Sequence, residues 1–286
     1  MTAPSLGRLL ISHITLRGSE LAQLYALIAE QPGVSYDELT DALMPSGASD
    51  SSFGLEEAPL REALNFLLVA GLVEQQGPSR RKASFQATPL LAGAPFALLL
   101  LRHIHRHDDE RQRAPALIYR QLVSDDVLAI TPSVLREQME RGLHRKLFTW
   151  TGEKISFWGH LVGYIGLIRR SEREAELLIV PQPNMALAAL RWGSGQASTS
   201  SLDAVLEVID ANLFACFTSR GRVHRGLAQT LLALDRLGRI RLSHSADAAR
   251  SIMLGERRVS DIWLINSGVD GHAVGAPQQR ERMAGG

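Results

Sequence analysis

The segment AGLVE at residues 70–74 decides the fold, because it joins a run of apolar residues at helical spacing to a short alternating stretch. The same pattern returns as IGLIR at residues 165–169 and as LGRIR at residues 237–241. A glycine directly after a helix adopts positive φ and lets the last helical carbonyls find hydrogen-bond donors. Alternation of apolar and polar residues indicates a strand. The sequence therefore predicts three helix–glycine–strand junctions along the chain.

The residues around the first junction predict a complete small unit. Apolar residues recur at helical spacing in residues 19–30. Ser35, followed by Glu38 three positions later, forms the pattern of a capping box and starts a second helix. A third helix precedes the junction, and residues 72–75 and 83–87 predict a hairpin after it.

This order of elements resembles the winged-helix fold, in which the third helix passes through a glycine into the first wing strand. Residues 58–73, APLREALNFLLVAGLV, are similar to that part of bacterial winged-helix regulators. The second junction follows the same plan, with Thr131-Pro132 as a helix cap. After the third junction, we expect strands at residues 240–243 and 251–254 around a loop, completed by a strand at residues 259–265.

We therefore expect an α+β, mostly helical protein of three tandem winged-helix units. Gly/Ser/Thr-rich stretches predict linkers, and the Gly/Pro/Gln-rich end predicts a flexible tail. The expected divisions are residues 1–91 for the first winged helix, 92–113 for a connecting helix and charged segment, 114–193 for the second winged helix, 194–201 for a linker, 202–267 for the third winged helix and 268–286 for the tail.

Composition indicates an ordinary globular protein without an overall attraction to polyanions. The chain has 286 residues, 45% of them hydrophobic, and a formal net charge of +1, so nucleic-acid binding would depend on local basic patches. A single cysteine, Cys216, excludes an internal disulfide and is typical of a small buried residue. With no signal peptide and no apolar run long enough to span a membrane, we expect a cytoplasmic protein.

Histidines alternate in the segment HIHRHDDE at residues 103–110, a pattern that invites a metal-site interpretation. On a helix only His103 and His107 of this run share a face, whereas a catalytic zinc site needs three protein ligands. A solvated charged helix end is the more economical explanation. The sequence holds no nucleophile elbow, phosphate-binding loop or HExxH motif. We therefore expect a non-enzymatic protein with no cofactor and no metal.

Basic residues gather where winged-helix proteins contact DNA, and they are densest around the third junction. Residues 219–242 hold six arginines and one acidic residue. Arginine matches phosphate geometry in a bidentate way, and a helix N-terminus adds backbone donors for the same anion. The alternative is that these arginines solubilise the surface or bind acidic proteins. The candidate nucleic-acid-binding residues are Arg80, Arg81, Lys82, Arg145, Lys146, Lys154, Arg169, Arg170, Arg220, Arg222, Arg225, Arg239 and Arg241.

A narrower resemblance concerns the order of parts. A leading winged helix, KISFW at residues 154–158, VPQP at residues 180–183 and a last winged unit are together similar to DpdG-type accessory proteins of bacterial DNA-modification and defence systems. This resemblance implies a non-catalytic subunit of a multi-protein assembly, active in anti-phage or plasmid defence. Together with the basic residues, it leads us to expect a DNA-binding subunit whose partners are double- or single-stranded DNA and other protein subunits, with homo-oligomers as a further option. The alternatives are a winged-helix protein–protein adaptor without nucleic-acid contact, and a transcriptional regulator.

Overall fold

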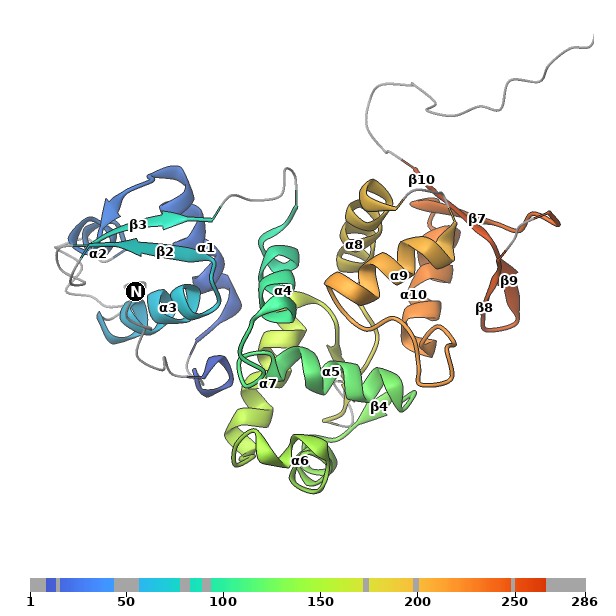
Figure 1. Cartoon of the computed structure of the whole chain (residues 1–286), viewed down its shortest axis with the longest axis horizontal. Coiled ribbons are helices and arrows are strands. Elements are labelled where there is room, and N and C mark those ends of the chain that lie inside the picture. The colour runs from blue at the N-terminus through green and yellow to red at the C-terminus, as the bar shows by residue number, and fades with distance from the viewer. Residues whose placement is uncertain are drawn as a thin grey trace, which may run out of the picture.

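The protein is a mixed α+β chain with ten α-helices and small antiparallel sheets in the part that the structure, a computed structural model, describes. That part comprises residues 9–13, 16–43, 57–77, 83–88, 94–171, 175–197, 201–247 and 250–265. Figure 1 shows α1–α3 on one side of the molecule, α8–α10 on the other, and α4, α5 and α7 between them.

The first part contains one sheet of order β1-β3-β2 against three helices. The predicted capping box is confirmed, since the Glu38 N–H donates to Ser35 Oγ at 3.2 Å and the Ser35 N–H donates to Glu38 Oε2 at 2.7 Å. The predicted hairpin is confirmed as well, with Val73 opposite Ala87. The elements are η1 (Leu10–Ser12), α1 (Gly18–Glu30), β1 (Val34–Ser35), α2 (Tyr36–Leu43), α3 (Glu57–Val69), β2 (Val73–Gln76) and β3 (Ser84–Ala87).

The middle part repeats this order of helices and strands after one additional helix, α4, and its sheet has the order β4-β6-β5. The Thr131 side chain accepts a hydrogen bond from the Val134 N–H, which confirms the predicted helix cap. The elements are α4 (Phe96–Arg106), α5 (Ala114–Ser124), β4 (Ala129–Ile130), α6 (Pro132–Arg141), η3 (Leu143–Lys146), α7 (Gly152–Ile165), β5 (Arg169–Arg170) and β6 (Leu177–Leu178).

The last part differs from the expected strand pairing. Strand β7 pairs with β10, not with β8, and β8 pairs with β9 instead. The reason is local, because Gly255 at φ +64° allows a two-residue turn between Leu254 and Arg257 and closes a separate hairpin. The elements are α8 (Pro183–Gln196), α9 (Leu202–Asn212), α10 (Arg225–Arg236), β7 (Ile240–Ser243), β8 (Ile252–Leu254), β9 (Arg257–Val259) and β10 (Asp261–Leu264).

Helix α8 has no counterpart in the sequence prediction, and residues 194–196, which we assigned to a linker, form its last turn. Gly193, directly before the predicted linker, is a packing position. A methyl group on Gly193 would lie 3.0 Å from Cγ1 of Ile209, so the glycine allows α8 and α9 to approach closely. Helix α8 contacts both α9 and α10.

The three glycine junctions are confirmed in detail. Gly71, Gly166 and Gly238 all have positive φ, at 71°, 90° and 66°. After each glycine, the next N–H donates to a helical carbonyl five residues earlier, as from Leu72 to Leu67 at 2.9 Å. The two hydrogen bonds of this C-terminal cap satisfy helical carbonyls that would otherwise lack donors at the helix end.

Buried side chains from all three parts form one continuous apolar core. Trp150, Phe157 and Trp158 lie in it at 3% exposure or less, so none of them offers a surface for stacking bases. Cys216 is fully buried, as predicted. Within the described residues, no helix is long and apolar enough to cross a membrane.

Candidate nucleic-acid interface

Two of the predicted arginines lie in the loop that enters α10. Arg220 and Arg222 are exposed, and no side-chain hydrogen bond or ion pair holds either of them within the described part of the chain. They line a polar cleft of about 330 Å³ with Arg225 and with the end of α5. Asp125 and Asp126 line the same cleft, so the positive charge there is partly balanced. The loop itself is fixed by a hydrogen bond from the Ser219 N–H to the Ser124 carbonyl at 2.9 Å.

The N-terminus of α10 is occupied by protein groups, which corrects the expectation that it offers free donors to phosphate. His224 is fully buried; its Nδ1 accepts from the Gly226 N–H at 3.2 Å and its Nε2 donates to the Val127 carbonyl at 3.0 Å. Burial is the main reason that the pKa of His224 is lowered. Arg225 pairs with Asp126 at 3.2 Å, so this predicted phosphate ligand already has an anionic partner.

A second group of arginines lies at the C-terminal end of α10, and the twelve residues of the helix, about 18 Å, separate it from the first group. Arg236 and Arg241 are exposed. Arg239 is half-buried, and its Nε lies buried without a hydrogen-bond partner among the described residues. The predicted cluster is therefore divided into two groups at opposite ends of one helix.

The remaining candidates belong to the other parts of the chain. The ammonium group of Lys154 already has partners within the protein. It donates a hydrogen bond to the Thr149 carbonyl and lies 4.8 Å from the centre of the Phe148 ring. Arg80, Arg81 and Lys82 lie outside the described residues. The exposed candidates in the middle part are Arg145 and Lys146 on η3 and Arg169 and Arg170 on β5.

The alternating histidines of α4 contact two other helix ends. His107 Nε2 donates to the Val69 carbonyl at 3.0 Å and His103 hydrogen-bonds the Ala70 backbone, both at the end of α3. His105 points the other way, and its Nε2 donates to the Ala211 carbonyl of α9 at 3.1 Å. The shared face of His103 and His107 is thus as predicted. No group of three or more metal-ligating side chains occurs among the residues that the structure describes.

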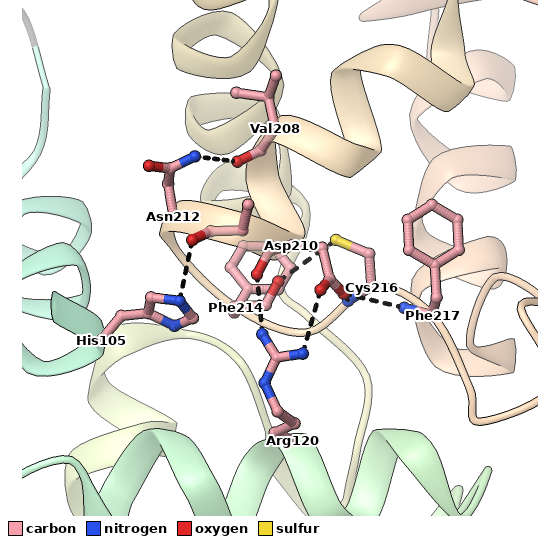
Figure 2. Close-up of polar contacts among 9 residues, drawn as sticks. His105, Arg120, Val208, Asp210, Asn212, Phe214, Cys216 and Phe217 are labelled. Carbon is pink, nitrogen blue, oxygen red and sulfur yellow. Dashed lines mark hydrogen bonds and ion pairs between the residues drawn. The ribbon is translucent and has the colours of Figure 1, made fainter. Parts of the chain in front are cut away.

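A carboxylate joins the middle part to the loop before α10. Figure 2 shows Arg120 of α5 pointing toward Asp210 of α9. Arg120 Nη1 donates to Asp210 Oδ2 at 3.1 Å, while Asp210 Oδ1 accepts from the Cys216 and Phe217 N–H groups at 2.6 and 3.3 Å. Burial is the main cause that raises the pKa of the Cys216 thiol well above its usual value. The thiolate is therefore disfavoured, and Cys216 is a poor nucleophile.

No family model, curated protein or solved structure matches this chain.

Sequence reasoning missed one exposed aromatic residue. Trp263 on β10 is 44% exposed and lies directly opposite Arg241 on β7. The signal was present in the alternation of residues 261–264, where Ile262 is buried at 4% and Trp263 faces outward. Arg236, in the last turn of α10, was likewise absent from the predicted set.

Proposed function

We propose that the chain is a tandem array of three winged-helix units and that its third unit binds nucleic acid. Support comes from an order of elements that occurs three times: helix, short strand, two helices and two strands. The sets are α1-β1-α2-α3-β2-β3, α5-β4-α6-α7-β5-β6, and α8, the single bridge residue Ser201, α9, α10, β7 and β10. In each set the first strand pairs with the last, as Ser201 does with Asp261.

The nucleic-acid proposal depends on the exposure of three arginines and on their lack of ion pairs among the described residues. Arg220, Arg222 and Arg241 are exposed and are not paired with a carboxylate in the described part of the protein. By contrast, Arg250 in the same unit is held by Asp203 and Glu207. Unpaired guanidinium groups at both ends of α10 are suited to phosphates along a nucleic-acid backbone.

Fluorescence anisotropy of labelled DNA across a salt series tests this proposal. Each phosphate contact contributes about −0.9 to the slope of log affinity against log salt for duplex DNA and about −0.7 for single strands. Changing Arg220, Arg222 and Arg241 together to glutamate should weaken binding and flatten this slope by roughly two to three. Arg250→Glu, which reverses the charge of one arginine that is already paired, is the control for the effect of a single reversal. Equal affinities for the triple variant and the control would refute the assignment.

We further propose that the protein is a non-catalytic subunit of a multi-protein bacterial assembly, in line with the resemblance to DpdG-type defence proteins. Several of its chemically versatile side chains are engaged in contacts within the fold. His105, His107 and His224 bond backbone carbonyls, and Cys216 is buried. Co-purification of the protein with other subunits from its own cell, with and without nuclease treatment, tests this part of the proposal.

A protein–protein adaptor is the second candidate, and one surface favours it. A groove of about 510 Å³ runs along α6 and the end of α5. Val134, 46% exposed, lines it beside Met139. If the protein binds no DNA at low salt but forms a stable complex that Val134→Glu disrupts, the adaptor function replaces the DNA-binding one.

A further inference from the structure

The two-stranded sheet of the last part carries exposed side chains on one face. In its register Ile262 lies opposite Leu242, both buried at 4%, and these residues face the core. The next pair, Trp263 and Arg241, points the other way because neighbouring side chains on a strand alternate. Figure 1 shows β7 and β10 at the outer edge of the molecule, away from α1–α3.

The outward face extends beyond Trp263. The Ile265 N–H donates to the Arg239 carbonyl at 3.2 Å, so the pairing continues one step past the end of β10. Ile265 is 40% exposed and shares the face of Trp263, two residues away. Side chains directly opposite on antiparallel strands lie about 4.5–5.5 Å apart at Cβ. The exposed Trp263 therefore has Arg241 as its cross-strand neighbour.

Arginines outnumber carboxylates in this part of the chain, although Arg250 is paired with Asp203 and Glu207, and Arg241 lies close enough to Asp235 for its charge to lower the pKa of that carboxyl. Residues 236–265 contain six arginines and three carboxylates. Of the carboxylates, Asp261 is on the face of Trp263 and accepts a hydrogen bond from the Ser260 hydroxyl at 2.6 Å. Arg257 is neutralised by Asp235, whereas Arg241 forms no ion pair with a carboxylate among the described residues. An arginine beside an exposed tryptophan matches a partner that combines negative charge with flat aromatic rings, and nucleic acid supplies both.

We propose that Trp263, together with Arg241, is a stacking platform for an unpaired base of single-stranded nucleic acid. The indole would lie against the face of the base and the guanidinium would contact an adjacent phosphate. Bases in a duplex are already stacked on both sides, so a flat sheet face reaches them only when the strand is open. Stacking tolerates any sequence because each base has a π face. This inference rests on the proposed function. It adds that the nucleic acid is single-stranded and that Trp263 contacts its bases.

Tryptophan fluorescence offers a direct readout because the other three tryptophans are shielded. Trp150 and Trp158 are buried, and Trp192 is half-buried with the guanidinium of Arg102 5.9 Å from its ring centre. Titrating the full chain with oligothymidylate should quench the fluorescence of the wild-type protein. In Trp263→Phe that quenching should vanish while most of the affinity remains, since phenylalanine also stacks.

Affinity measurements separate stacking from phosphate binding. Trp263→Ala should bind oligothymidylate roughly 5- to 150-fold more weakly. It should bind an abasic oligonucleotide of the same length and charge as well as the wild type does. Met253→Ala, which removes an exposed apolar side chain from the adjacent hairpin, is the matched control and should leave both affinities unchanged.

The outcomes distinguish the two proposals. If the wild type binds oligothymidylate and Trp263→Ala binds it equally well, the stacking platform is refuted while nucleic-acid binding stands. If Trp263→Ala loses affinity for the abasic strand to the same extent, the residue acts on the fold or on phosphate contacts and the inference fails. If the wild type binds neither strand at low salt, the proposed function itself fails.

Discussion

Replacing Asp210 with alanine tests whether one carboxylate fixes the loop that leads into α10. The substitution removes the acceptor of the Cys216 N–H, which belongs to a fully buried residue, and of the Phe217 N–H. A buried donor left unsatisfied costs roughly 1–3 kcal/mol. The ion pair with Arg120, whose side chain is 41% exposed, adds at most about 1 kcal/mol. We expect the free energy of unfolding to fall by about 1–4 kcal/mol.

Urea denaturation followed by circular dichroism measures this loss. Glu207→Ala is the matched control, since Glu207 lies on the same helix and its ion pair with Arg250 is solvent-exposed; it should cost less than about 0.5 kcal/mol. Asp210→Asn keeps an oxygen acceptor and should fall between the two. Equal urea midpoints for Asp210→Ala and Glu207→Ala would show that the loop does not depend on this carboxylate.

Three further substitutions test other contacts, each by denaturation. Gly226→Ala should destabilise by about 1–3 kcal/mol, because the new methyl carbon would lie 1.9 Å from the Ile179 carbonyl oxygen; a wild-type midpoint would refute the close approach. Gly238→Ala meets nothing within 4 Å but must hold φ at +66°, so it should cost about 1–2 kcal/mol, and an unchanged midpoint would contradict that conformation. The lowered pKa of His224 means that the folded protein binds this proton more weakly than the unfolded chain, whose histidine pKa is about 6.5. Stability should therefore decrease as pH falls below about 6.5, levelling off beneath the folded pKa, and His224→Gln should reduce that decrease.

Helix caps that depend on a few neighbouring residues could be predicted from the sequence. The caps at Gly71, Gly166 and Gly238 and the capping box at Ser35 depend on local backbone chemistry, so their patterns sufficed. Helix α8 was missed because the Gly/Ser/Thr composition of residues 194–201 suggested a linker. The role of Gly193 depends on a neighbouring helix that only the fold supplies.

The candidate site was predicted less well because exposure and pairing depend on distant residues. Arg225 forms an ion pair with Asp126, which lies 99 positions earlier in the chain. Strand β10 was anticipated, but its pairing with β7 depends on the intervening hairpin closing on itself. Without that register, nothing in the sequence placed Trp263 beside Arg241.

Helix α4 has a mechanical consequence. Its histidines bond the last turn of α3 on one side and the last turn of α9 on the other, and its leucines lie in the shared core. Both flanking parts thus share an eleven-residue rod, about 16 Å long. If this helix unfolds, both flanking parts lose their contacts with it together. We therefore expect the protein to unfold cooperatively with a single calorimetric peak, and not as independently folding domains.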